Sequence, residues 1–66
     1  MDIILNGEPR EVAEACSLTL LTEQLGLTGK RYAVEVNEEI VPRSQHATHI
    51  LQPGDKVEIV HAIGGG

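Results

Sequence analysis

The sequence is poor in aromatic and sulfur-containing residues, and these gaps restrict how the chain can build a core. Phe and Trp are missing and Tyr32 is the single tyrosine, so the core must be aliphatic. The one cysteine, Cys16, cannot form an internal disulfide, which favours a reducing cytoplasm. No apolar run approaches the roughly 20 residues of a membrane helix, and the first residues do not resemble a signal peptide. We therefore expect a cytoplasmic protein that has no membrane contact.

Basic residues are also scarce. Five Lys and Arg residues stand against ten Asp and Glu residues, which gives a net charge of −5. Nucleic-acid binding is not expected, because contact with phosphates requires a basic stripe. An acidic chain of 66 residues fits a one-domain carrier that meets basic surfaces on protein partners.

The chain ends in three consecutive glycines, Gly64, Gly65 and Gly66. Glycine has no side chain to pack and has the largest backbone entropy to lose, so we expect a flexible tail. A tail without Cβ atoms can enter a channel too narrow for other residues, and the α-carboxylate of Gly66 is unhindered. A frayed terminus is the simpler alternative. The apolar strand predicted immediately before the tail favours a tail that is presented to a partner.

Hydrophobic periodicity and turn residues predict an α+β fold. We expect strands at 1–5, 8–12, 32–37, 40–41 and 57–63, and a helix that follows the N-cap Ser17 and ends at Gly26. On this helix, Leu18, Leu21 and Leu25 predict a buried stripe that Leu20 widens, while Thr22, Glu23 and Gln24 predict a polar face. The order indicates a mixed sheet of four to five strands with one main helix packed across it, and with the first and last strands parallel in the middle. This is the β-grasp (ubiquitin-like) architecture, with a domain at 1–63 and a tail at 64–66.

A small apolar surface is expected beside the tail. Val60 and Ala62 face away from the predicted core, and Ile4 joins them if the first and last strands are neighbours. With His61 and Ile63 they form the candidate partner-binding set. Scattered exposed aliphatic residues, and a half-buried sheet histidine at position 61, are the alternatives.

The residues that most often carry catalysis or metal do not form a recognisable site. Residues 38–39 are adjacent glutamates on a predicted turn without apolar neighbours, which indicates a solvated face. His46 and His49 would need a third ligand to hold a metal, and the spacing of Cys16 does not require that they meet. Cys16 is expected to be a buried small hydrophobe. The chain is therefore predicted to be neither an enzyme nor a metal protein.

Three stretches resemble a known family. Residues 36–44 (VNEEIVPRS), residues 54–60 (GDKVEIV) and the terminal Gly65-Gly66 together resemble the ThiS family, the ubiquitin-like sulfur carriers of thiamine biosynthesis. The resemblance covers essentially the whole chain. The main departure is Gly64, which replaces a bulkier residue.

The resemblance implies a mechanism for the tail. A partner adenylyltransferase (ThiF-like) would use Mg-ATP to convert the Gly66 carboxylate into an acyl-adenylate, and the carrier would need no cofactor of its own. Sulfur from a cysteine desulfurase or a sulfur relay protein would then give the thiocarboxylate. A thiazole synthase (ThiG-like) would receive the tail and place the sulfur in the thiazole ring of thiamine.

Two other interpretations stay open from the sequence. The chain could be the small subunit of a molybdopterin synthase, or another thiocarboxylate carrier such as a donor for tRNA thiolation. From a different class, it could be an interaction module or a ubiquitin-like protein modifier, joined to lysines of its targets through Gly66.

Overall fold

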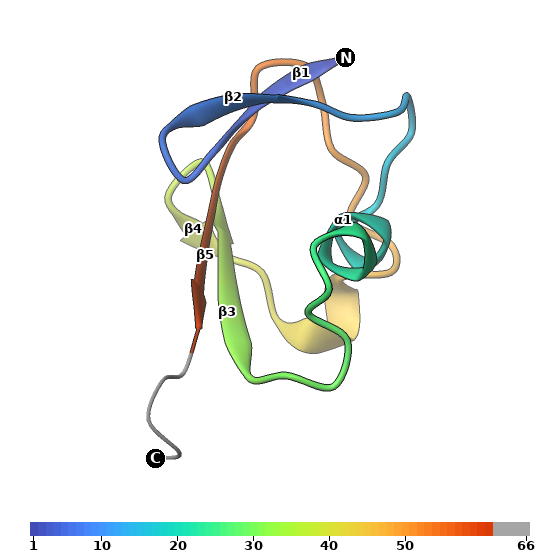
Figure 1. Ribbon diagram of the computed structural model, residues 1–66, viewed down its shortest axis with the longest axis vertical. Coiled ribbons are helices and arrows are strands. Elements are labelled where there is room, and N and C mark those ends of the chain that lie inside the picture. Colours follow the sequence, from blue (N-terminus) through green and yellow to red (C-terminus); the bar gives the residue numbers. More distant parts are fainter. Residues whose placement is uncertain (62–66) are drawn as a thin grey trace.

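The computed structural model describes residues 1–61, which form a mixed sheet with a helix packed across one face (Figure 1). The strand order in the five-stranded sheet is β2-β1-β5-β3-β4, so the last strand lies in the centre. The elements are β1 (Asp2–Leu5), β2 (Glu8–Glu11), α1 (Leu18–Gln24), β3 (Tyr32–Val36), β4 (Glu39–Ile40), the 3-10 helix η1 (Arg43–Gln45) and β5 (Lys56–His61). The predicted β-grasp architecture is confirmed.

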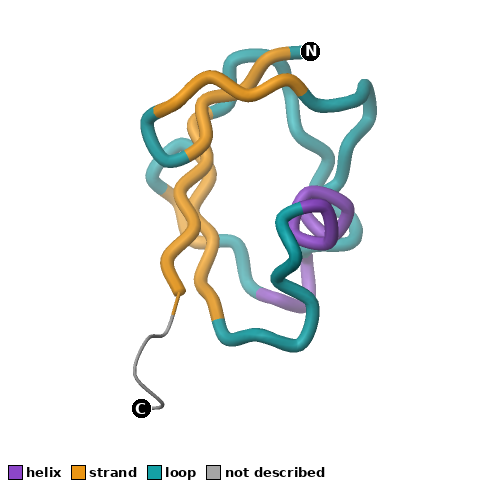
Figure 2. The backbone as a smooth tube through the Cα atoms, viewed as in Figure 1, coloured by secondary structure: helices purple, strands orange, loops and turns teal. Residues whose placement is uncertain are grey.

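The first and last strands are parallel neighbours in the middle of the sheet, as predicted. Ile4 lies opposite Lys56 and Leu5 opposite Val57. On its other side β5 pairs antiparallel with β3 from Tyr32–His61 to Val36–Val57. β5 therefore carries the chain through the centre of the sheet toward residues 62–66, as the tube in Figure 2 also shows.

Positive-φ turns set both hairpins. Asn6 (φ 49°) and Gly7 (φ 84°) join β1 to β2, as the Asn-Gly pair predicts. Asn37 (φ 51°) and Glu38 (φ 71°) alone join β3 to β4, so the short strand is Glu39–Ile40 and the prediction of 40–41 was one residue late. β2 is an edge strand, which accommodates Pro9 because its missing N–H is not needed there.

The helix begins and ends where its caps predict, but its faces differ from the prediction. The Ser17 hydroxyl accepts a hydrogen bond from the Leu20 N–H at 3.1 Å, and Gly26 (φ 74°) follows the last turn. Thr22 is only 3% exposed, whereas Leu20 is 38% exposed. The buried stripe is thus Leu18, Leu21 and Thr22, and the partly buried C-cap Leu25 completes the i, i+3, i+4, i+7 pattern of one helix face. Thr22 tolerates burial because its hydroxyl donates to the Thr19 carbonyl at 3.0 Å.

The core between the helix and the sheet is aliphatic, as the missing aromatic residues require. Its fully buried side chains come from four elements and two loops: Ile3, Leu18, Leu21, Leu51, Val34, Val57 and Cys16. Among the described residues, no helix has the length and apolar character needed to cross a bilayer.

Candidate functional site

The candidate site is the end of β5, from which the chain continues into the predicted tail. The last two described residues pair with the start of β3, Val60 with Ala33 and His61 with Tyr32. Ala62, Ile63, Gly64, Gly65 and Gly66 lie outside the described residues. The predictions made for them, including the domain boundary at residue 63 and a flexible tail, therefore stay predictions.

Val60 and His61 are exposed at this end of the sheet. Val60 lies on the face that points away from the helix and is 64% exposed, and His61 is also exposed rather than half-buried. A shallow hollow of about 320 Å³ lies here, lined by Arg31, Tyr32, Ala33, Val60 and His61. Two residues of the predicted partner-binding set, Val60 and His61, therefore lie exposed at the end of β5, which we call the root of the tail.

The expected apolar patch of Ile4 with Val60 does not form. The strands are neighbours, but their register places Ile4 opposite Lys56, four residues before Val60 along β5. At about 3.3 Å per residue this separates the two side chains by roughly 13 Å. Ile4 is half-buried near the start of β5, away from the tail, because β1 ends at Leu5 and cannot follow β5 to its end.

A second exposed aliphatic residue on the open face was not in the predicted set. Ile40 on β4 lies opposite Glu35 of β3 and is 72% exposed, the largest exposure among the large hydrophobic residues described. The sequence did offer a signal for Ile40. It lies in a predicted short strand directly after two glutamates, and a strand in such a polar setting can expose its apolar side chains. The open face therefore carries Ile40 and Val60 on either side of β3.

Three side chains form a stack next to the end of β5. The Arg43 guanidinium carbon lies 4.1 Å from the centre of the Tyr32 ring. The other partner of this ring is His46, whose ring centre is 6.0 Å away at an interplanar angle of 23°. His46 is 3% exposed, and its Nε2 donates to the Val41 carbonyl at 2.9 Å while its Nδ1 is buried without a partner. The histidine is thus a buried structural residue that supports the Tyr32 ring.

Asn6 secures β5 just before its end. Its side-chain oxygen accepts a hydrogen bond from the Ile59 N–H at 2.8 Å, and its own N–H donates to the Val57 carbonyl at 2.8 Å. β1 has ended at this level, so the asparagine side chain replaces the missing strand. The sequence indicated only a turn at Asn6, and this contact across 53 positions of chain was not predicted.

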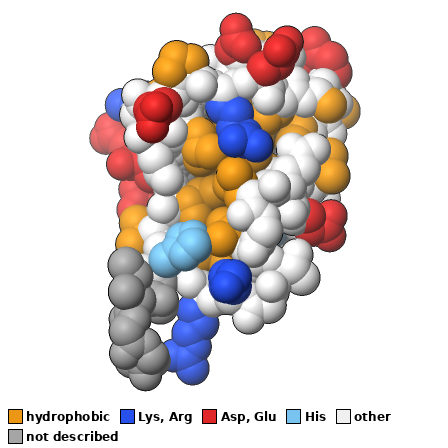
Figure 3. Space-filling model, viewed as in Figure 1, with side chains coloured by type: hydrophobic (Ala, Val, Ile, Leu, Met, Phe, Trp, Pro, Cys, Tyr) orange, Lys and Arg blue, Asp and Glu red, His pale blue; other side chains and the backbone are white. Residues whose placement is uncertain are grey.

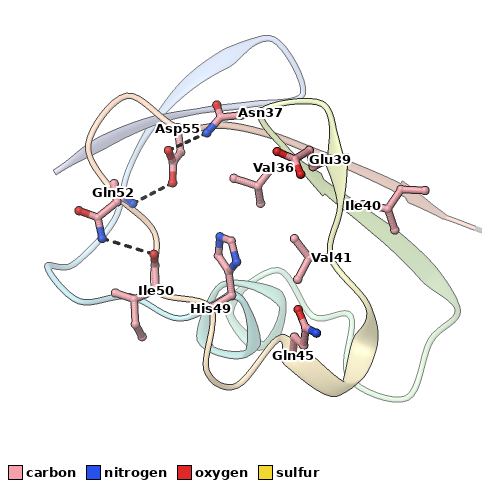
Figure 4. Close-up of a pocket in the computed structure, with 10 residues that line it drawn as sticks. All are labelled: Val36, Asn37, Glu39, Ile40, Val41, Gln45, His49, Ile50, Gln52 and Asp55. Carbon is pink, nitrogen blue, oxygen red and sulfur yellow. Dashed lines mark hydrogen bonds between the residues drawn. The ribbon is translucent and has the colours of Figure 1, made fainter.

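Another hollow lies at the opposite end of β5 (Figure 4). It has a volume of about 430 Å³, and His49 points toward its middle. On one wall Asp55 fixes the turn that precedes β5. Its carboxylate accepts a hydrogen bond from the Asn37 side-chain amide at 3.0 Å and one from the Gln52 N–H at 2.9 Å. These groups are occupied in shaping the turn before β5. No trio of His, Cys, Asp or Glu suited to a metal ion occurs within residues 1–61.

Cys16 is fully buried between β2 and α1. Burial raises the pKa of its thiol, because the thiolate would lose its hydration. The side chain is therefore an inert core residue, as predicted, and it lies outside the candidate site.

The arrangement defines a β-grasp protein whose central strand leads directly to its C-terminal residues. The model of the ThiS family matches residues 3–66. Over its whole length the chain is 36% identical to the full length of the sulfur carrier protein ThiS of Escherichia coli. The crystal structure of the thiamine biosynthesis protein ThiS from Geobacter metallireducens superposes with a TM-score of 0.84 at 32% identity, with both chains fully covered. The chain belongs to the ThiS family.

A second kind of relative is much longer. The chain is 42% identical, over all of its 66 residues, to a segment of the thiazole synthase of Paramagnetospirillum magneticum. It spans only about a fifth of that protein, since the match covers 20% of its length.

Proposed function

We propose that the chain is a non-catalytic sulfur carrier of thiamine biosynthesis, which carries sulfur as a thiocarboxylate on Gly66. The observation that supports this most strongly is family membership combined with the position of β5. The central strand is paired with β3 as far as His61, and Gly64, Gly65 and Gly66 follow it three positions later in the sequence. Such a placement suits a terminus that a partner enzyme must reach.

The chemistry explains why the carrier needs partners. A carboxylate is a poor electrophile, so an adenylyltransferase first uses Mg-ATP to convert it to an acyl-adenylate, with release of pyrophosphate. The terminal sulfur of a persulfide, supplied by a cysteine desulfurase or a relay protein, then attacks the carbonyl carbon and displaces AMP. A second thiol cleaves the remaining S–S bond and leaves the thiocarboxylate. The described residues contribute no group to these steps.

We infer that thiazole synthase is the sulfur acceptor. The thiazole synthase of Paramagnetospirillum magneticum carries a segment that is 42% identical to this chain. Covalent linkage of two modules raises their effective concentration, and it benefits modules that must meet. A domain that occurs joined to this enzyme in one organism is a natural partner for it in another.

The test is an intact mass of the protein purified from its own cells without reductant, with a Gly66-deleted chain as the control. We expect a species in which one oxygen is exchanged for sulfur, present only in the full chain. A further incubation with the adenylating enzyme, ATP and a sulfur source should increase it. The sulfur carrier function would be refuted by its absence after that incubation, and isopeptide adducts to lysines would instead support a protein modifier.

A further inference from the structure

Charge is unevenly distributed over the molecule. The chain has a net charge of −5, yet three of its five Lys and Arg residues lie at the end of the sheet where β5 ends. Lys30 and Arg31 directly precede Tyr32, the partner of His61, and Arg43 lies over the Tyr32 ring. We call Lys30, Arg31 and Arg43 the basic collar. In Figure 3 a histidine and two basic side chains lie in the lower half of the view, where β5 ends, whereas most of the acidic side chains lie in the upper half, together with a further basic group.

The acidic end is placed by the same topology. Asp2 and Glu11 form a cross-strand pair beside the turn before β5, because the Gly54 N–H donates to the Asp2 carbonyl at 2.8 Å. Glu38 and Asp55 lie at that end too, since the β3–β4 turn is tied to Asp55 through Asn37. The molecule therefore has an acidic end and a basic end, and the tail begins at the basic one.

Within the collar, Arg43 is held in position by contacts to the Tyr32 ring and to the Lys30 backbone. Arg43 is stacked on Tyr32, and its guanidinium donates to the Lys30 carbonyl at 3.3 Å. The Tyr32 ring is in turn supported by His46, which is buried and bonded to the Val41 carbonyl. A charge that is fixed on a rigid platform loses less side-chain entropy when it pairs with a partner.

The collar is too far from Gly66 to act on the reacting carboxylate of an extended tail. Five residues follow His61, and they span at most about 17 Å when fully extended. In a channel narrow enough to exclude side chains the tail has to be extended. The collar would then meet the surface that surrounds the entrance of the channel.

We propose that the basic collar binds an acidic protein surface around the tail entrance of thiazole synthase. This proposal rests on the sulfur carrier function proposed above. Any enzyme that receives Gly66 must approach the end of the molecule where β5 ends, and that end is positive although the chain as a whole is negative. Complementary charge requires carboxylates on the approaching surface, and the acidic far end orients the carrier during encounter.

The test compares two charge-reversed variants in binding to purified thiazole synthase. The first carries Lys30→Glu and Arg31→Glu. Its matched control carries Arg10→Glu and Lys56→Glu, which make the same change in net charge away from the root of the tail. We expect the collar variant to bind about tenfold more weakly than the control at ~0.02 M salt, and the difference to fall below about twofold at ~1 M, where the screening length is near 3 Å.

Folding is monitored separately, by the thermal unfolding midpoint of each variant. If the collar reversal lowers that midpoint more than the control does, Lys30→Gln with Arg31→Gln replaces it, and a smaller loss with the same salt dependence is expected. Equal affinities of the collar variant and the control at low salt would overturn the proposal. It would also be overturned if the collar reversal weakened binding only to the adenylating enzyme.

Measuring thiocarboxylate formation on the unmodified chain distinguishes a failure of this proposal from a failure of the carrier function. If the unmodified chain gains sulfur at Gly66 but the collar reversal does not weaken its binding to thiazole synthase, the acidic docking surface is refuted and the carrier function stands. If no thiocarboxylate forms on the unmodified chain, the carrier function itself fails.

Discussion

Replacing Asn6 should loosen the end of β5. Its side-chain oxygen accepts from the Ile59 N–H at 2.8 Å, and its backbone has φ 49°. Asn6→Ala removes both adaptations, because alanine has no acceptor and disfavours positive φ. An unsatisfied, partly buried N–H costs about 1–3 kcal/mol, and a left-handed alanine costs about 1 kcal/mol more.

The total loss is roughly 2–4 kcal/mol, which should lower the unfolding midpoint of a domain of this size by roughly 10–30 °C. Two further variants separate the contributions. Asn6→Gly keeps the backbone conformation but loses the acceptor, so it should lie between the wild type and Asn6→Ala. Asn6→Asp keeps an acceptor oxygen and tolerates positive φ, so its stability should change by less than about 1 kcal/mol.

Thermal unfolding followed by circular dichroism gives the stability of each variant, and amide hydrogen exchange gives the local effect. In Asn6→Gly, protection of the Ile59 amide should fall more than protection of amides in β2. If Ile59 keeps its protection in Asn6→Gly, or if the alanine and aspartate variants are equally stable, the asparagine side chain does not secure β5.

Three smaller predictions follow from other contacts. Ser17→Ala removes the hydroxyl that accepts from the Leu20 N–H, so stability should fall by about 1 kcal/mol in a thermal melt, whereas Ser17→Asp should restore it. Glu58 and Glu35 lie directly opposite each other, so Glu58→Lys should raise stability by about 0.5 kcal/mol at low salt, and a gain that persists at high salt would contradict the electrostatic reason. Cys16 should not react with a maleimide until the protein unfolds. Burial raises the pKa of the Cys16 thiol in the folded state, so above about pH 8.5 the thiol ionises readily only in the unfolded chain. The free energy of unfolding should therefore fall as the pH rises above that value, and Cys16→Ala should remove this part of the pH dependence.

Most of the fold could be predicted because each element carries its own local chemistry. Asn6-Gly7 accepts the positive φ that a two-residue hairpin needs, and Ser17 supplies the acceptor that a helix start lacks. The strand–strand–helix–strand order then leaves few topologies, because parallel strands need a long crossover. The central position of β5 follows from that constraint.

Register and helix orientation could not be predicted in the same way. The helix has seven residues, too few for periodicity to decide between Leu20 and Thr22 as the flank of its buried stripe. Ile4 and Val60 belong to strands that were correctly paired, but the offset between them depends on where β1 ends against β5. Local sequence carries no information on that offset.

The collar was missed for a related reason. Arg43 and Lys30 are 13 positions apart and belong to different segments, and only the folded chain brings the guanidinium to the Lys30 carbonyl. A count of charges over the sequence gives an acidic protein, and from that count we expected basic surfaces on its partners. That expectation stays a prediction, but the folded chain places three basic residues near the end of β5, and this placement is the reason we propose an acidic partner surface there.

The end of β5 is paired on one side and unpaired on the other within residues 1–61, and this explains why the Asn6 side chain is needed to secure it. At His61 the strand pairs with Tyr32 of β3, but β1 has already ended at Leu5, so no strand among residues 1–61 pairs with the other edge there. Unpaired strand edges attract other strands. Asn6 occupies the Ile59 N–H with a side chain that cannot extend into a further strand. The central strand is therefore secured by Asn6 at Ile59 and paired with β3 as far as His61, and Arg43 is held on Tyr32 next to that last pair.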